Sequence, residues 1–208
     1  MSTAIYPHAE AAARHRVGYP AIVAAKGIPS QTGVWVAVSA IAMSFAALTS
    51  ALVVRQASGS DWQRFVLPRI LYLDTIILMA SSYTLSLSRK RFAAGSAASP
   101  ALRASGFYWL YMTLTLGLLF VAGQLLAWRS LASQGLFLAT NPSSSFFYVL
   151  TAMHGLHLLG GVLGLIYVAI RLRRSARNAQ TSLSTASVYW HFVDLLWVYL
   201  LMVIAIRM

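Results

Sequence analysis

The chain has 208 residues, of which 59% are hydrophobic and only 10% are charged. A soluble domain carries about 25% charged residues, so this composition excludes an ordinary soluble fold and indicates an integral membrane protein. The absence of cysteine excludes disulfides, thiolate metal sites and cysteine-ligated clusters.

The net charge of +12 comes from 16 basic and 4 acidic residues. In a soluble protein such a charge would suggest a nucleic-acid partner. Here the basic residues lie at the ends of apolar runs, where they orient a membrane protein and contact lipid headgroups. We therefore expect no nucleic-acid partner.

Residues 1–32 form a polar, alanine-rich tail, which we expect to lie in the cytoplasm and which lacks the pattern of a cleaved signal peptide. Five apolar runs follow, each long enough to cross the hydrocarbon core as a helix, because about 20 residues span about 30 Å. Too little polar sequence remains for a second domain. We predict an all-α integral membrane five-helix bundle over residues 33–208, with spans at 33–54, 67–88, 106–128, 146–170 and 187–206.

Five spans place the two termini on opposite sides of the membrane. With the N-terminus in the cytoplasm, 5 of the 16 basic residues are outside and the other 11 are inside. The outer ones are Arg55, Arg64, Arg69, Arg129 and Arg207. The positive-inside rule therefore predicts a cytoplasmic N-terminus and a periplasmic C-terminus. The odd number of spans argues against a simple duplicated transporter.

The fourth and fifth spans carry His154, His157, His191 and Asp194 at membrane depth. Such groups are costly in lipid and usually face a protein interior. The two groups of each span are three residues apart and share a helix face. His157 lies 11 residues and Asp194 12 residues from the outer ends of their spans, which are depths of about 16 and about 18 Å. We predict a His157–Asp194 contact that fixes the imidazole tautomer, within a polar clasp of all four groups between these spans.

Two further observations concern the same spans. Gly160 and Gly164 have the spacing that lets membrane helices approach closely. The alternative use of the four polar groups is a copper or zinc site. The two histidines of the fourth span cannot hold one haem from both faces, because they lie on one helix.

Asp74 lies inside the second span, about 10 Å from its outer end, and Gln124 is the main polar group of the third span. We expect a buried, hydrogen-bonded structural carboxyl, with Gln124, Ser81, Ser82 and Thr75 as possible neighbours. A role in proton relay is the alternative for Asp74.

The segments HGLHLLGG (154–161) and YWHFVDLLW (189–197) resemble two motifs of subunit III of the haem-copper terminal oxidases. The likeness continues through LPRILYLDTIILMASSYTL (67–85) and covers residues 33–206. Five spans are typical of the short bacterial form of this family.

Three positions depart from the family pattern. Ala40 stands where the first span typically carries an acidic residue after serine, and Ala127 where the third span often has glutamate. Asp74 stands where asparagine or glutamate is usual. A proton-buffering or carbodiimide-reactive carboxylate of the first span is therefore not carried over, and Asp74 and Asp194 are the only carboxylates left inside the membrane.

The resemblance implies a non-catalytic subunit of an aerobic respiratory oxidase in the bacterial inner membrane. Haem and copper would belong to the catalytic partner, subunit I, in a complex with subunit II. This chain would hold no metal, bind phospholipid, stabilise the catalytic subunit and support proton uptake. The lipid-contact candidates are Trp190, Arg171, Arg173 and Arg174.

Three other interpretations remain. The chain would be an accessory subunit of a nitric-oxide reductase, a haem- or copper-binding electron carrier, or a transporter or channel. The last needs a polar path through the bundle, for which four intramembrane ionisable groups are few. The electron donor of the oxidase, cytochrome c or quinol, is left open.

Overall fold

The computed structural model describes residues 29–94, 99–174 and 176–207, which form five long α-helices. All five are long and apolar enough to cross a membrane, which confirms the predicted all-α five-span fold. Residues 1–28 of the predicted tail lie outside the described residues. The helices are α1 (Pro29–Ser58), α2 (Ile70–Ala94), α3 (Pro100–Ser133), α4 (Pro142–Arg174) and α5 (Ala176–Arg207).

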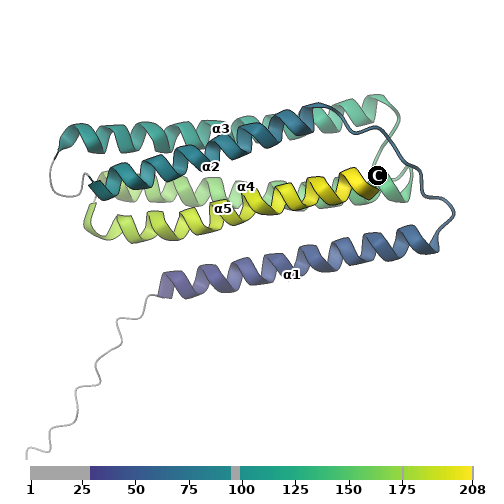
Figure 1. The fold of residues 1–208 in the computed structure, drawn as a ribbon, viewed down its shortest axis with the longest axis horizontal. Coiled ribbons are helices and arrows are strands. Elements are labelled where there is room, and N and C mark those ends of the chain that lie inside the picture. The colour runs from purple at the N-terminus through teal and green to yellow at the C-terminus, as the bar shows by residue number, and fades with distance from the viewer. Residues whose placement is uncertain (1–28, 95–98, 175, 208) are drawn as a thin grey trace, which may run out of the picture.

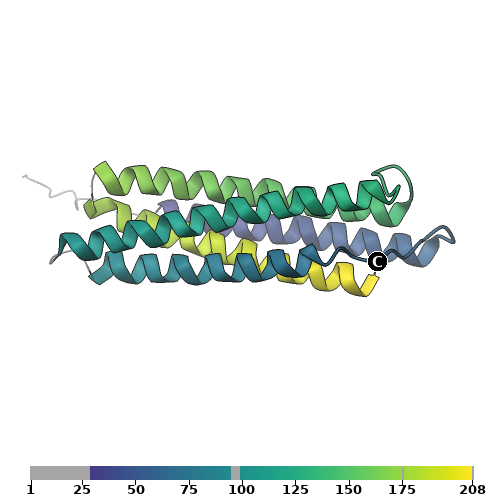
Figure 2. The ribbon, with the colours of Figure 1, turned by 90° about the horizontal axis from the view of Figure 1, so that it is seen from above.

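Helices α2 to α5 form an up-and-down four-helix bundle, and α1 lies against one side of it (Figures 1 and 2). The bundle is closed, because α2 contacts α3, α3 contacts α4, α4 contacts α5, and α5 contacts α2. Helix α1 contacts α5 and, less extensively, α4; within the described residues it does not contact α2 or α3. Helix α5 therefore has three helical neighbours, and it is the main support of α1.

The helices extend beyond the apolar runs that predicted them. Most of the segment between the predicted spans 146–170 and 187–206 is helical, since α4 ends at Arg174 and α5 already begins at Ala176. Helix α1 likewise begins at Pro29, inside the predicted tail. Hydropathy marks only the part of a helix that lies in hydrocarbon, whereas the hydrogen-bonded ladder continues into polar sequence.

Helix α2 begins later than predicted, at Ile70 instead of residue 67. The carbonyls of Pro68 and Arg69 accept hydrogen bonds from the amides of Leu71 (3.1 Å) and Tyr72 (3.2 Å). Pro68 thus precedes the first turn, as a residue without an amide proton can do at little cost.

The turn between α3 and α4 has strong local signals at both ends. Gly135 adopts φ +78° after α3, a left-handed conformation that glycine reaches most easily. The Leu136 amide donates to the Leu131 carbonyl (3.1 Å), as in a Schellman motif. The Asn141 side chain accepts from the Ser144 amide (2.8 Å) and caps α4, and Pro142 occupies its first position.

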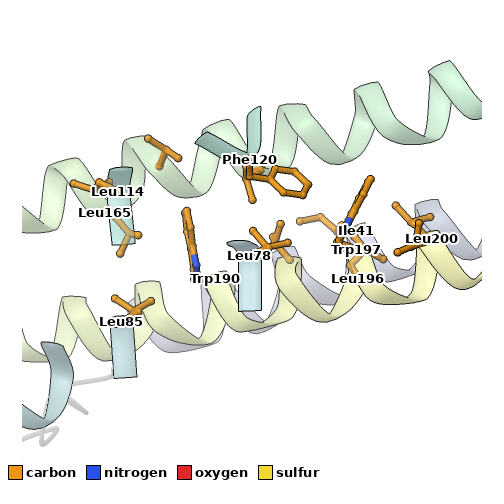
Figure 3. Packing of buried hydrophobic residues seen from close by; sticks show 14 of the residues in the cluster. Ile41, Leu78, Leu85, Leu114, Phe120, Leu165, Trp190, Leu196, Trp197 and Leu200 are labelled. Carbon is orange, nitrogen blue, oxygen red and sulfur yellow. The ribbon is translucent and has the colours of Figure 1, made fainter. Parts of the chain in front are cut away.

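The core fills the space between α2 and the other helices of the bundle. Leu71, Leu78 and Leu85 recur every seven residues on α2 and are at most 1% exposed. Figure 3 shows Phe120 of α3 and the indoles of Trp190 and Trp197 of α5 in this core. The two tryptophans are fully buried, and their position sets the face that α5 turns toward α2.

Candidate functional site: the polar face between α2 and α5

One face of α5 bonds to hydroxyl groups of α2. The indole of Trp190 donates to the Ser81 hydroxyl (3.1 Å), and the indole of Trp197 donates to the Thr75 hydroxyl (3.0 Å). Two turns of α5 are thus joined to two turns of α2 by side-chain hydrogen bonds. Because water and lipid offer no competing partner in a packed membrane core, such bonds stabilise a particular helix pairing.

His191 and Asp194 belong to this face. The Nδ1 atom of His191 lies 2.5 Å from the Ser82 hydroxyl, and its Nε2 atom lies 3.4 Å from the Ser86 hydroxyl. Asp194 is one turn further along α5 and is 3% exposed. Among the described residues, neither oxygen of its carboxyl has a partner in hydrogen-bonding geometry.

The predicted His157–Asp194 contact is not made through a hydrogen bond, because Asp194 has no hydrogen-bond partner among the described residues and His157 bonds elsewhere. The Nδ1 atom of His157 donates to the carbonyl of Met153 in its own helix (2.7 Å), and the ring meets Phe45 of α1 edge-on. The depths of the two residues match, but their side chains face different neighbours. The imidazole tautomer of His157 is set by its own helix, not by α5.

His154 is fully buried between aromatic rings. Its ring lies 5.0 Å from the Trp197 ring and 5.7 Å from the Phe120 ring, measured between centroids. Within the described part of the chain, neither ring nitrogen has a hydrogen-bond partner. His154 thus joins α4 to α5 through ring contact. The predicted clasp is divided, with His191 and Asp194 turned toward α2.

Contact between α4 and α5 instead depends on Gly161. A Cβ atom at this position would lie 3.2 Å from both the Trp190 and Tyr189 rings. The predicted partner Gly164 has nothing within 4 Å, so the spacing identified the right region but not the glycine in closest contact. The Tyr189 hydroxyl also donates to the backbone carbonyl of His157 (3.0 Å).

The second buried carboxyl, Asp74 of α2, is paired with α3. Asp74 is 1% exposed, and the Gln124 side-chain amide donates to its Oδ2 atom (2.9 Å). This confirms the predicted Asp74–Gln124 neighbourhood. Gly123 makes it possible, because any Cβ atom there would overlap the Asp74 carboxyl group.

Of the four residues predicted to contact lipid, one is buried and the three arginines are exposed. Trp190 is fully buried, since Gly161 of α4 and Gly117 of α3 leave a slot for its rings. It therefore does not face lipid. Arg171, Arg173 and Arg174 are exposed at the end of α4. The Arg173 guanidinium lies 5.6 Å from the centre of the Tyr111 ring.

A metal site finds no support in the residues that the structure describes. They contain no group of three or more histidine, cysteine, aspartate or glutamate side chains that could hold an ion. His154 faces aromatic rings, His157 faces α1, and His191 faces α2. The copper or zinc alternative needed these groups on one face.

The sequence patterns that predicted the site did not identify its hydroxyl partners in full. Ser86 was not singled out, and Thr75, Ser81 and Ser82 were expected near Asp74. The signal was present, because Thr75, Ser82 and Ser86 are spaced by seven and four residues and share one face of α2. The spacing of these residues does not indicate which helix this face of α2 contacts, and in the structure that helix is α5.

Comparison with known proteins assigns this arrangement to a family. The profile of cytochrome c oxidase subunit III matches residues 23–207. The chain belongs to this family. The subunit III of Mycobacterium tuberculosis, described as a probable cytochrome c oxidase subunit 3, is 38% identical over 132 residues. The match covers 62% of each chain, so the chain is aligned with less than two thirds of that relative's length.

Two further members of the subunit III family show the range of the likeness. Cytochrome c oxidase subunit 3 of Thermostichus vulcanus is 35% identical over 146 residues, 68% of this chain and 66% of that one. Quinol oxidase subunit 3 of Bacillus spizizenii is 27% identical over 173 residues, 81% of this chain and 82% of that one. The predicted resemblance to subunit III of the haem-copper oxidases is confirmed, and the five helices long and apolar enough to cross a membrane suggest a multi-pass membrane protein.

Proposed function

We propose that this chain is the non-catalytic subunit III of an aerobic respiratory haem-copper oxidase in the bacterial inner membrane. It would flank the catalytic subunit I, in a complex with subunit II, and stabilise it during turnover. Haem and copper would reside in the catalytic partner. The N-terminus would lie in the cytoplasm and the C-terminus in the periplasm.

The observation that carries this proposal is how the polar groups of the two motif segments are used. The Trp190 and Trp197 indoles bond to α2, and the Tyr189 hydroxyl bonds to α4. These groups hold the chain's own helices in place and do not converge on a substrate-sized site. This use suits a subunit that stabilises a neighbour and leaves the chemistry to it.

Phospholipid binding is part of the proposal. Arg171, Arg173 and Arg174 are exposed where α4 ends, at the level where anionic headgroups meet basic side chains. The Arg103 guanidinium donates to the Leu172 carbonyl (2.7 Å) and adds positive charge nearby. Support of proton uptake by the catalytic partner is the second part, and it needs protonatable groups near the membrane surface.

The test is purification of the complex through an affinity tag on this chain. We expect a haem-containing catalytic chain to co-purify and the preparation to oxidise cytochrome c or quinol. Deletion of the gene for this chain should leave the initial rate of O₂ reduction largely intact but shorten the time for which turnover continues. A preparation without haem, or immediate loss of all turnover while the chain is still bound, would contradict the proposal.

A further inference from the structure

A line of polar side chains leads from the surface of the bundle toward the buried Asp194. At the end where α2 finishes, a cavity of about 400 Å³ is lined by Ser86, Arg89 and Lys90 among others. The Ser86 hydroxyl lies 3.4 Å from the Nε2 atom of His191. The Nδ1 atom on the other side of the ring lies 2.5 Å from the Ser82 hydroxyl, and Asp194 lies one turn further along α5 on the same face as His191.

The inner end of this line has unused hydrogen-bonding capacity. Asp194 is 3% exposed, and neither of its oxygens has a hydrogen-bond partner among the described residues. A buried carboxyl without donors is expensive as an anion. An intramembrane carboxyl of this kind is retained when it serves a function.

We propose that Asp194 is a proton-accepting site supplied from the cavity at Arg89 through His191 and Ser82. A proton from water in the cavity reaches the Nε2 atom of His191 by way of the Ser86 hydroxyl. The Nδ1–H group of His191 releases its proton to the Ser82 oxygen. The Ser82 O–H group gives its own proton to an Asp194 oxygen once rotation of the two side chains brings them into hydrogen-bonding geometry. The net change is conversion of one carboxylate and one proton into a carboxylic acid.

The charges around the line determine how His191 acts in it. Arg89 and Lys90 lie at the cavity, and the Arg89 guanidinium donates to the hydroxyls of Ser184 and Ser187 of α5 (3.3 Å each). A relay in which one ring nitrogen gains a proton as the other loses one adds no lasting positive charge beside these cations. After transfer, the ring and both hydroxyls return to their first state by rotation and tautomer exchange.

The remaining ionisable groups of the core face elsewhere. Asp74 is on α2 but bonds to Gln124 of α3. On α4, His154 lies between aromatic rings and His157 faces α1. Among the described residues of α1, the Thr49 hydroxyl bonds to Tyr199 (3.0 Å) and the Gln56 side chain bonds to Arg207, so both meet α5 away from His191 and Asp194. The line from Ser86 to Asp194 is therefore separate from the rest of the polar core.

The transfer stands on this geometry alone, whereas its use in proton uptake by an oxidase depends on the proposed function. The test is infrared spectroscopy of the purified complex after rapid dilution into D₂O, because the carboxylic C=O stretch shifts when deuterium replaces the proton. The Asp194→Asn variant identifies the Asp194 band across about pH 5 to 9. Asp74→Asn identifies the matched buried carboxyl that has no line to the surface.

We expect the Asp194 band to exchange about tenfold more slowly in Ser82→Ala, since loss of one relay hydrogen bond raises the barrier by about 1.4 kcal/mol. Ser82→Thr, which keeps the hydroxyl, should restore the native rate. Ser81→Ala is the matched control, because Ser81 bonds to Trp190 outside the line. The Asp74 band should exchange at one rate in all these variants.

If Ser82→Ala does not assemble, Ser86→Ala at the outer end of the line should slow exchange in the same way. The proposal would be overturned if assembled Ser82→Ala or Ser86→Ala exchanged at the native rate. It would also be overturned if Asp194→Asn removed no carboxylic band from the spectrum. These results are distinct from failure of the proposed function. A complex without haem would contradict the oxidase assignment, yet the exchange of Asp194 would still be measured in it.

Discussion

The two buried carboxyls of this chain, Asp74 of α2 and Asp194 of α5, are compensated very differently. Asp74 turns toward α3, where Gln124 donates to it at 2.9 Å and Gly123 leaves room for it. Asp194 turns toward α2 from α5 and has no donor in hydrogen-bonding geometry within the described chain. Both are at most 3% exposed, so burial alone does not distinguish them.

The difference indicates different uses of the same functional group. Burying a carboxyl costs free energy unless hydrogen bonds replace those lost from water. At Asp74 the Gln124 amide supplies one such bond, which is typical of a structural group. At Asp194 no such bond is formed within the described chain, and the Ser82 hydroxyl on the facing helix is already engaged with His191. This arrangement favours a group whose protonation can change.

The largest loss of stability is expected at Gly123, where the backbone of α3 packs directly against the Asp74 carboxyl. Gly123→Leu would place side-chain atoms where the Asp74 carboxyl lies. Overpacking together with displacement of a buried polar group should destabilise the α2–α3 pairing by about 3 kcal/mol or more. The expected result is loss of the subunit from the purified oxidase, measured by native gel electrophoresis.

Gly155→Leu is the matched control for this change. A Cβ atom at Gly155 meets nothing within 4 Å, so this variant should remain in the complex. Equal retention of both variants would show that α2 and α3 do not need the close approach at Gly123. It would also weaken the contrast between the two carboxyls.

Gln124→Leu should have the next largest effect. It removes the donor to Asp74 while keeping side-chain volume, so a buried carboxyl loses its partner at a cost of about 1–3 kcal/mol. The thermal midpoint of subunit release from the complex should fall. The double change Asp74→Leu with Gln124→Leu should recover much of that loss, because no polar group is then left unpaired. A double variant as unstable as the sum of the single ones would argue against the pairing.

The sequence predicted the Asp74 side of the molecule better than the Asp194 side, for a physical reason. The helical rise gives the depth of a residue, and depth placed His157 and Asp194 at one level. It does not give the direction in which a helix face looks. Helix α5 contacts α1, α2 and α4, so its polar face had three possible neighbours, and matching depth favoured the wrong one.

Close contact was similarly hard to assign to single residues. Aromatic side chains are common where membrane helices meet the interface, and this favoured Trp190 as a lipid contact. The slot that buries it is made by Gly117 of α3 and Gly161 of α4. Two glycines on different helices form one site only after folding, so no local pattern marks them as a pair.

Trp190→Phe tests the contact between α2 and α5, and we expect a smaller loss of stability. An aromatic ring remains, but the hydrogen bond to Ser81 at 3.1 Å is lost, which should cost about 1 kcal/mol, and the smaller phenyl ring adds a packing loss. Ser81 keeps its bond to the Leu78 carbonyl, so the hydroxyl is not left unpaired. The thermal midpoint of subunit release should fall by less than in Gln124→Leu. A larger fall would show that the α2–α5 face contributes more stability than the Asp74 pair.

Asp61 is a third carboxyl, outside the membrane, and it gives the smallest expected effect. It accepts a hydrogen bond from Arg55 at 2.7 Å, and this bond lowers the pKa of the Asp61 carboxyl from its usual range. Because the folded-state pKa is lowered, the Asp61 carboxylate stabilises the fold at pH values above its unfolded pKa of about 3.9. This stabilisation is lost as the pH falls through the folded-state pKa. Exposed pairs contribute little and are screened by salt.

The Asp61→Asn variant should therefore match the native chain at high salt and differ slightly at low salt near neutral pH. The measurement is the thermal midpoint of subunit release as a function of pH, with and without salt. The native curve should bend downward below about pH 4, and the variant curve should lack this contribution. An equal bend in both curves would mean that other carboxyls of the complex dominate its acid sensitivity, and that Asp61, unlike the two buried carboxyls, has no measurable consequence.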